Sequence, residues 1–138
     1  MAFLLDTNVI VEPQRRRPDP KVIDWLSAAD EGSLYLSAFT FAELRKGIAQ
    51  LSDRRRGAVL EREVGTLRAR FDGRILPIDD AVLDRWGRIT GTTAAAGAPM
   101  PGIDAIFAAT ALQHDLTLVT RNERHMQASG VTLLNPWR

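Results

Sequence analysis

The chain contains no cysteine and only two histidines, His114 and His125, among its 138 residues. The absence of cysteine excludes disulfides, thiolate metal sites and a cysteine nucleophile. Lys21 and Lys46 are the only lysines. The motifs of serine hydrolases, P-loop proteins, zinc proteases and dinucleotide-binding proteins are also missing. The chemistry left to this chain is therefore that of carboxylates.

Long apolar runs are missing as well. The apolar start Met1–Leu5 is interrupted by Asp6 and has no basic residue before it, so we expect no signal peptide. No stretch approaches the roughly 20 apolar residues of a membrane span. We therefore expect a cytoplasmic protein with no membrane partner.

The overall composition is that of one globular domain, with 45% apolar and 25% charged residues. No linker, repeat or low-complexity tract divides the chain, so we expect a single domain over residues 1–138. The net charge of +1 gives no strong indication of a polyanionic partner. The basic runs Arg15–Arg17 and Arg54–Arg56 are able to attract phosphate backbones, although such runs are more often solvated surfaces.

Short apolar runs alternate with segments of helical periodicity, a pattern that predicts a parallel sheet covered by helices on both faces. The fold class is therefore α/β, a three-layer α/β/α sandwich with a short, parallel five-stranded sheet. Pro77 indicates that the third strand lies at an edge of the sheet. The expected strands are 3–5, 34–36, 75–78, 116–119 and 131–134, and the expected helices are 20–29, 40–51, 54–71, 80–96, 103–114 and 123–128.

Acidic and polar residues stand at the ends of several expected elements. Asp6 directly follows the first strand, and Thr120–Asn122 follows the fourth. Glu43 and Asp104 lie in the first turns of two helices. Because ligands of open α/β folds bind beyond the carboxyl ends of the strands, Asp6 and Thr120–Asn122 are the first indication of where a site lies.

Each of these acids also has a structural interpretation. Asp6 could cap the turn that follows it. Glu43 could close a capping box with Thr40, or pair with Lys46 one turn later. Asp104 is favoured at its position by the helix dipole. Taken singly, none of these positions distinguishes a catalytic role from a structural one.

Taken together, four segments resemble the successive motifs of the PIN-domain nucleases, in the order of that family and over nearly the whole chain. They are Leu5–Ile10, Thr40–Leu44, Asp104–Ala111 and Leu118–Asn122, and Asn135–Trp137 resembles the tail of one subgroup. The length leaves no room for a second domain. This favours a resemblance to the VapC and FitB type toxins of bacterial toxin–antitoxin pairs.

The resemblance implies roles for particular residues. Asp6, Glu43 and Asp104 correspond to the catalytic, metal-binding acids of the family. Asn122 corresponds to a fourth catalytic position that is aspartate in many relatives, and its amide adds no negative charge. The residues expected to support the site are Thr7 and Asn8, which would orient Asp6, and Thr120, which would line the site. For His125, a substrate contact and a plain surface position both remain open.

The resemblance further implies a Mg²⁺-dependent endoribonuclease, with Mn²⁺ as a substitute, that forms the toxin component of a type II toxin–antitoxin pair. Clustered carboxylates would repel a polyanionic substrate, and a hard cation with oxygen ligands removes that repulsion. A metal-activated water would then attack the phosphorus. The implied partners are an RNA substrate, a cognate antitoxin protein and a second copy of the chain in a homodimer.

Two other carboxylate-based functions do not fit this sequence. A haloacid dehalogenase-like phosphatase requires a second aspartate at the position that Asn8 occupies. A receiver domain requires a lysine near the end of the chain, where none exists. A non-catalytic module that binds RNA or protein remains open, and it would differ from the nuclease by needing neither the metal nor the three acids together.

Overall fold

The computed structural model describes all of residues 1–138. Its centre is a sheet of five parallel strands in the order β3-β2-β1-β4-β5. This confirms the expected sheet and places the third strand at an edge. The two edge strands, β3 and β5, are shorter than expected. In β3 the reason is Pro77, which has no N–H to extend the ladder. The strands are β1 (Phe3–Leu5), β2 (Leu34–Ser37), β3 (Ile75–Leu76), β4 (Thr117–Val119) and β5 (Leu133–Leu134).

Seven α-helices surround the sheet. They are α1 (Thr7–Val11), α2 (Pro20–Ala28), α3 (Ala38–Ala49), α4 (Arg54–Arg70), α5 (Asp80–Ala95), α6 (Gly102–Gln113) and α7 (Glu123–Met126). Asp19, Asp53 and Asp79 cap α2, α4 and α5 by accepting hydrogen bonds from backbone amides of the first turn. None of these helices is long and apolar enough to cross a membrane.

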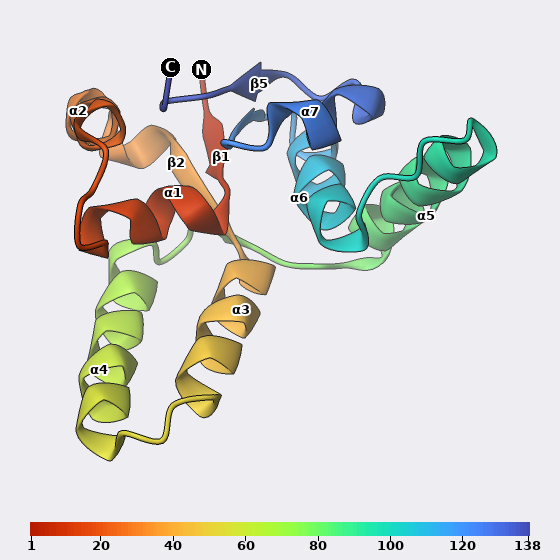
Figure 1. Ribbon diagram of the computed structural model, residues 1–138. Helices are drawn as coiled ribbons and strands as arrows, with labels where there is room; N and C mark the ends of the chain where they lie inside the picture. The colour runs from red at the N-terminus through yellow and green to blue at the C-terminus, as the bar shows by residue number, and fades with distance from the viewer.

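The helices form a layer on each face of the sheet, as Figure 1 shows. Neighbouring residues of a strand point to opposite faces, so Leu4 packs with α5, α6 and α7 while Leu5 packs with the helices of the other face. Leu118 and Val119 in β4 divide in the same way. The expected three-layer α/β/α sandwich is confirmed.

The start of α3 differs from the expectation. The helix begins at Ala38 rather than Thr40, and its cap is Ser37, whose hydroxyl accepts a hydrogen bond from the amide of Phe39 at 3.0 Å. Thr40 is fully buried inside the helix. The capping box expected for Thr40 and Glu43 is therefore wrong, since another residue already caps the helix one turn earlier.

Helix α1 was not expected from the sequence. Four of its five residues are β-branched and have low helix propensity: Thr7, Val9, Ile10 and Val11. Val9 and Ile10 are buried in the core against the sheet. Tertiary packing thus forms this helix, which begins directly where β1 ends and turns the chain away from the sheet.

Candidate active site at the carboxyl edge of the sheet

The candidate site lies where the three central strands end. Strand β1 lies between β2 and β4 and is parallel to both, so their carboxyl ends meet at one edge of the sheet. Helix α1 starts there after β1, and α3 starts there after β2 (Figure 1). This topology brings Asp6 to the same edge as the loop Thr120–Asn122 after β4. Glu43 comes from the second turn of α3.

Asp6 is only 6% exposed. Its carboxylate accepts a hydrogen bond from the hydroxyl of Thr120 at 2.7 Å. The backbone amide of Asn122 donates in turn to the same hydroxyl at 3.1 Å. Asp6 occupies the N-cap position of α1 without a side-chain capping hydrogen bond of normal geometry, although the backbone amides of Asn8 and Thr7 still favour its charged form. The hydroxyl of Thr120 thus holds Asp6 in place and links it to the segment that carries Asn122.

Glu43 is held by a different hydroxyl. The side chain of Thr7 donates to the Glu43 carboxylate at 2.6 Å. The oxygens of Thr7 and Thr40 are 2.9 Å apart, so Thr40 donates to Thr7 and completes the chain of hydrogen bonds. No ion pair joins Glu43 to Lys46, although this lysine is near enough to lower the pKa of Glu43 slightly. The buried Thr40 therefore orients Glu43 through Thr7.

The expected roles of Thr7 and Asn8 need correction. The Thr7 side chain bonds to Glu43 and not to Asp6, and Asn8 is exposed. Only the backbone amides of these two residues favour the charged form of Asp6. The side chains of Thr7 and Asn8 point toward α3 and toward solvent. The hydroxyl that reaches Asp6 comes instead from Thr120, which directly follows β4.

The three acids are near enough for their charges to influence one another. Burial, as the main cause, raises the pKa of Asp6, and the charge of Asp104 raises it further against the opposing effect of Thr120. Burial also raises the pKa of Glu43, with further contributions from the charges of Asp6 and Asp104. Residues from three separate segments therefore share one negative field, as expected for acids gathered in a single site.

Asp104 lies in the first turn of α6, as the sequence indicated. Its side chain is 15% exposed, and its carboxylate lies 3.1 Å from Nδ1 of His125. The imidazole is more than half exposed. The structure thus places His125 directly against one of the three acids, on the solvent side, rather than at an unrelated surface position.

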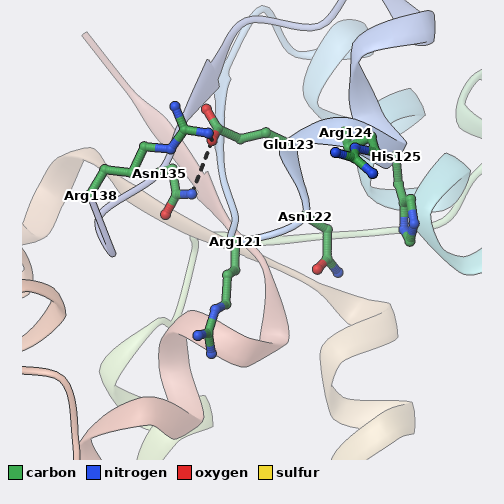
Figure 2. A pocket seen from close by; sticks show the side chains of 7 residues that line it. All are labelled: Arg121, Asn122, Glu123, Arg124, His125, Asn135 and Arg138. Atoms are coloured by element: carbon green, nitrogen blue, oxygen red, sulfur yellow. Dashed lines mark hydrogen bonds and ion pairs between the residues drawn. The ribbon is translucent and has the colours of Figure 1, made fainter.

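A polar pocket adjoins the acids around the loop between β4 and α7. Figure 2 shows its seven lining residues, which are Arg121, Asn122, Glu123, Arg124, His125, Asn135 and Arg138. The amide of Asn122 points away from the group formed by Glu123, Asn135 and Arg138 (Figure 2). The arginines were not among the candidates from the sequence. Arg121 lies within the fourth motif and Arg124 lies two residues after it, and this proximity is the signal that could have identified them; Arg138, at the end of the chain, has no such signal.

The donor set of the site consists of carboxylate oxygens, hydroxyls and one imidazole. No three Asp, Glu or His side chains of the chain are arranged to surround a metal ion by themselves. Any ion at this site would therefore depend on one or two carboxylates together with water. This is the usual mode of Mg²⁺ binding, because Mg²⁺ retains much of its hydration shell in proteins.

The architecture and the site define a class: an α/β/α domain with an acidic site at the carboxyl edge of a short parallel sheet. The sequence profile of the PIN domain matches residues 3–131. The chain is a member of the PIN-domain family. This confirms the family that the four sequence motifs indicated.

Similar proteins extend over the whole chain. Toxin FitB of Neisseria gonorrhoeae is 42% identical over 98% of both chains, and the VapC ribonuclease Y4jK of Sinorhizobium fredii is 33% identical over 98% of this chain and 97% of its own. The plasmid stability protein StbB of Pseudomonas syringae pv. tomato is 39% identical over 98% of both chains. Among solved structures, FitAcB from Neisseria gonorrhoeae superimposes with a TM-score of 0.93 over 99% of both chains at 39% identity.

Proposed function

We propose that this chain is an endoribonuclease and the toxin of a type II toxin–antitoxin pair. The observation that carries the proposal is the convergence of Asp6, Glu43 and Asp104 in one negative field, each held by a hydroxyl or imidazole group. Relatives over the full length of the chain bear the names toxin and ribonuclease. A site built from acids suits hydrolysis that needs no protein nucleophile.

The donor set supports Mg²⁺, with Mn²⁺ as a substitute, because hard cations prefer carboxylate oxygens and water. Asp6 and Asp104 are the residues we expect to hold the ion, with Glu43 as a direct ligand or as a ligand through water. When bound, such an ion supplies an activated water and stabilises charge on the leaving oxygen. The chain itself fixes the acids: Thr120 orients Asp6, and Thr7 orients Glu43.

The surroundings of the acids support a polyanionic substrate. Arg121 and Arg124 line the pocket beside them and form no ion pair, whereas Arg138 is paired with Glu123. Arginine side chains at such positions attract phosphate groups and bring the backbone of a nucleic acid to the acids. We propose that RNA is the substrate and that water attacks its phosphorus, leaving a 5′-phosphate and a 3′-hydroxyl. Such a reaction would take place in the cytoplasm.

The similarity to toxin–antitoxin complexes supports a protein partner. The structure of FitAB bound to a DNA fragment superimposes on this chain with a TM-score of 0.92 at 39% identity. We therefore propose that a cognate antitoxin binds this chain and that two copies form a homodimer. The antitoxin would inhibit cleavage by covering the acidic site.

Cleavage of labelled RNA by purified variants tests the proposed activity. Asp6→Asn and Asp104→Asn keep the shape of each side chain, but they remove a charge that the metal requires. We expect cleavage to depend on Mg²⁺, to stop on addition of chelator, and to fall to background in both variants with unchanged circular dichroism. Asp24→Asn, at an exposed position of α2, is the matched control and should cleave like the wild type. Full activity of either site variant would overturn the proposal.

A further inference from the structure

The segment Asn135–Arg138, which follows β5, is bonded to the loop between β4 and α7. The side-chain amide of Asn135 donates to the Glu123 carboxylate at 3.0 Å, and its carbonyl oxygen accepts from the amide of Trp137 at 2.9 Å. The guanidinium of Arg138 lies 2.9 Å from the same oxygen of Glu123. Figure 2 shows these three side chains converging. We call Asn135–Arg138 the clamp segment.

A second contact joins the clamp segment to the loop on the other side of Asn122. The guanidinium of Arg121 lies over the ring of Trp137, 5.5 Å from its centre. The residues immediately before and after Asn122 are therefore both attached to the clamp segment. The Asn122 side chain itself remains free of it and points the other way (Figure 2).

The same loop is bonded to the acids. The amide of Asn122 donates to Thr120, and Thr120 donates to Asp6. The backbone amide of Thr120 also donates to the carbonyl of Leu134, the residue just before the clamp segment, at 3.0 Å. Hydrogen bonds, together with the peptide bond between Asn122 and Glu123, thus connect the clamp segment through the loop to the most buried acid of the site.

We infer that Asn135 is a positioning residue for the nuclease reaction: through Glu123 it fixes the loop that sets Thr120 against Asp6 and Asn122 at the edge of the site. This inference rests on the proposed function. Two observations favour positioning over substrate binding. Both polar ends of the Asn135 side chain are used within the protein, and its partner Glu123 carries the same charge sign as a phosphate.

An exchange of the two side chains tests the inference. In Asn135→Asp, two carboxylates face each other and the bond to Glu123 is lost. In Asn135→Asp combined with Glu123→Gln, the donor moves to position 123 and the acceptor to position 135, and the net charge equals that of the wild type. The carboxylate at 135 can also still accept from the amide of Trp137. The double variant therefore restores the contact without restoring either original side chain.

We expect kcat on labelled RNA to fall about tenfold in the single variant, the loss typical of an outer contact of a metal site, with KM within twofold of the wild type. The double variant should recover most of this loss. Gln113→Glu is the matched control, because it adds one negative charge, as Asn135→Asp does, at the end of α6 opposite to Asp104. A wild-type kcat in Asn135→Asp, a loss confined to KM, or no recovery in the double variant would each overturn the inference.

Hydrogen exchange at the amide of Asn122 gives a readout that does not depend on activity. This amide is bonded to Thr120, so it should exchange faster in Asn135→Asp and at the wild-type rate in the double variant. If the wild type cleaves no RNA, the proposed function fails while exchange still decides whether the clamp exists. If Asn135→Asp does not fold, Asn135→Ala takes its place. An unchanged exchange rate of the Asn122 amide in Asn135→Ala would overturn the inference that the clamp segment fixes this loop.

Discussion

At the scale of single residues, Glu43 separates the structural from the catalytic interpretation. Its carboxylate caps nothing and instead accepts from Thr7. Glu43→Gln keeps an oxygen for this bond, so we expect the free energy of unfolding to change by less than about 0.5 kcal/mol. We expect RNA cleavage to fall by at least about 100-fold, more than the loss of an outer contact causes.

Urea denaturation and the cleavage assay measure the two effects in the same preparation. Glu63→Gln, an exposed change of the same kind on α4, is the control and should alter neither quantity. An active and stable Glu43→Gln enzyme would assign this residue a structural role.

The sequence was sufficient to find the acids but not their partners. The positions of Asp6 and Asp104 follow from local patterns, because each stands at the boundary of one recognisable element. The bond from Thr120 to Asp6 joins residues 114 positions apart, and the bond from Thr7 to Glu43 joins residues 36 apart. Such contacts depend on strand order and on the direction of side chains, which no local pattern contains.

At the scale of elements, helix α3 shows how a motif can mislead. The letters from Thr40 to Glu43 fit a capping box, yet Ser37 caps the helix one turn earlier. Helix α1 was not predicted at all, because its β-branched residues have low helix propensity and the helix is stabilised by packing against the sheet. The longer helices and the central strands were predictable, because their apolar periodicity extends over several turns or over a buried run.

The assigned cap of α3 predicts a specific loss of stability. Ser37→Ala removes the hydroxyl that accepts from Phe39 at a fully buried position. We expect the free energy of unfolding to fall by about 1 kcal/mol, the usual effect of losing a helix cap. The midpoint of urea denaturation measures this loss. Ser52→Ala, at an exposed position between α3 and α4, is the control, and equal midpoints for the two variants would contradict the assignment.

At the scale of the whole molecule, the acidic site opposes folding. The pKa values of Asp6 and Glu43 are raised in the folded protein, so the folded state binds protons more readily than the unfolded state. The contribution of these two groups to stability is therefore lost as the pH rises from their ordinary pKa values through their folded ones. Above their folded pKa values these two groups destabilise the chain in full, and we expect a bound cation to offset this effect.

Thermal melting at pH 7.5, in chelator and then in millimolar Mg²⁺ or Mn²⁺, tests the shared acidic site most directly. In chelator, Asp6→Asn should melt about 3 °C above the wild type, since it removes roughly 1 kcal/mol of repulsion and desolvation. The difference in melting temperature between Asp6→Asn and the wild type should shrink toward pH 4, because the wild-type acids become protonated there. Metal should raise the melting temperature of the wild type by several degrees, and that of Asp6→Asn and Asp104→Asn much less. The contradicting result is that the wild type, both site variants and the control Asp24→Asn all have the same melting temperature under every condition. The carboxylates would then neither repel one another nor bind a common metal ion, and this chain would not be a metal-dependent nuclease.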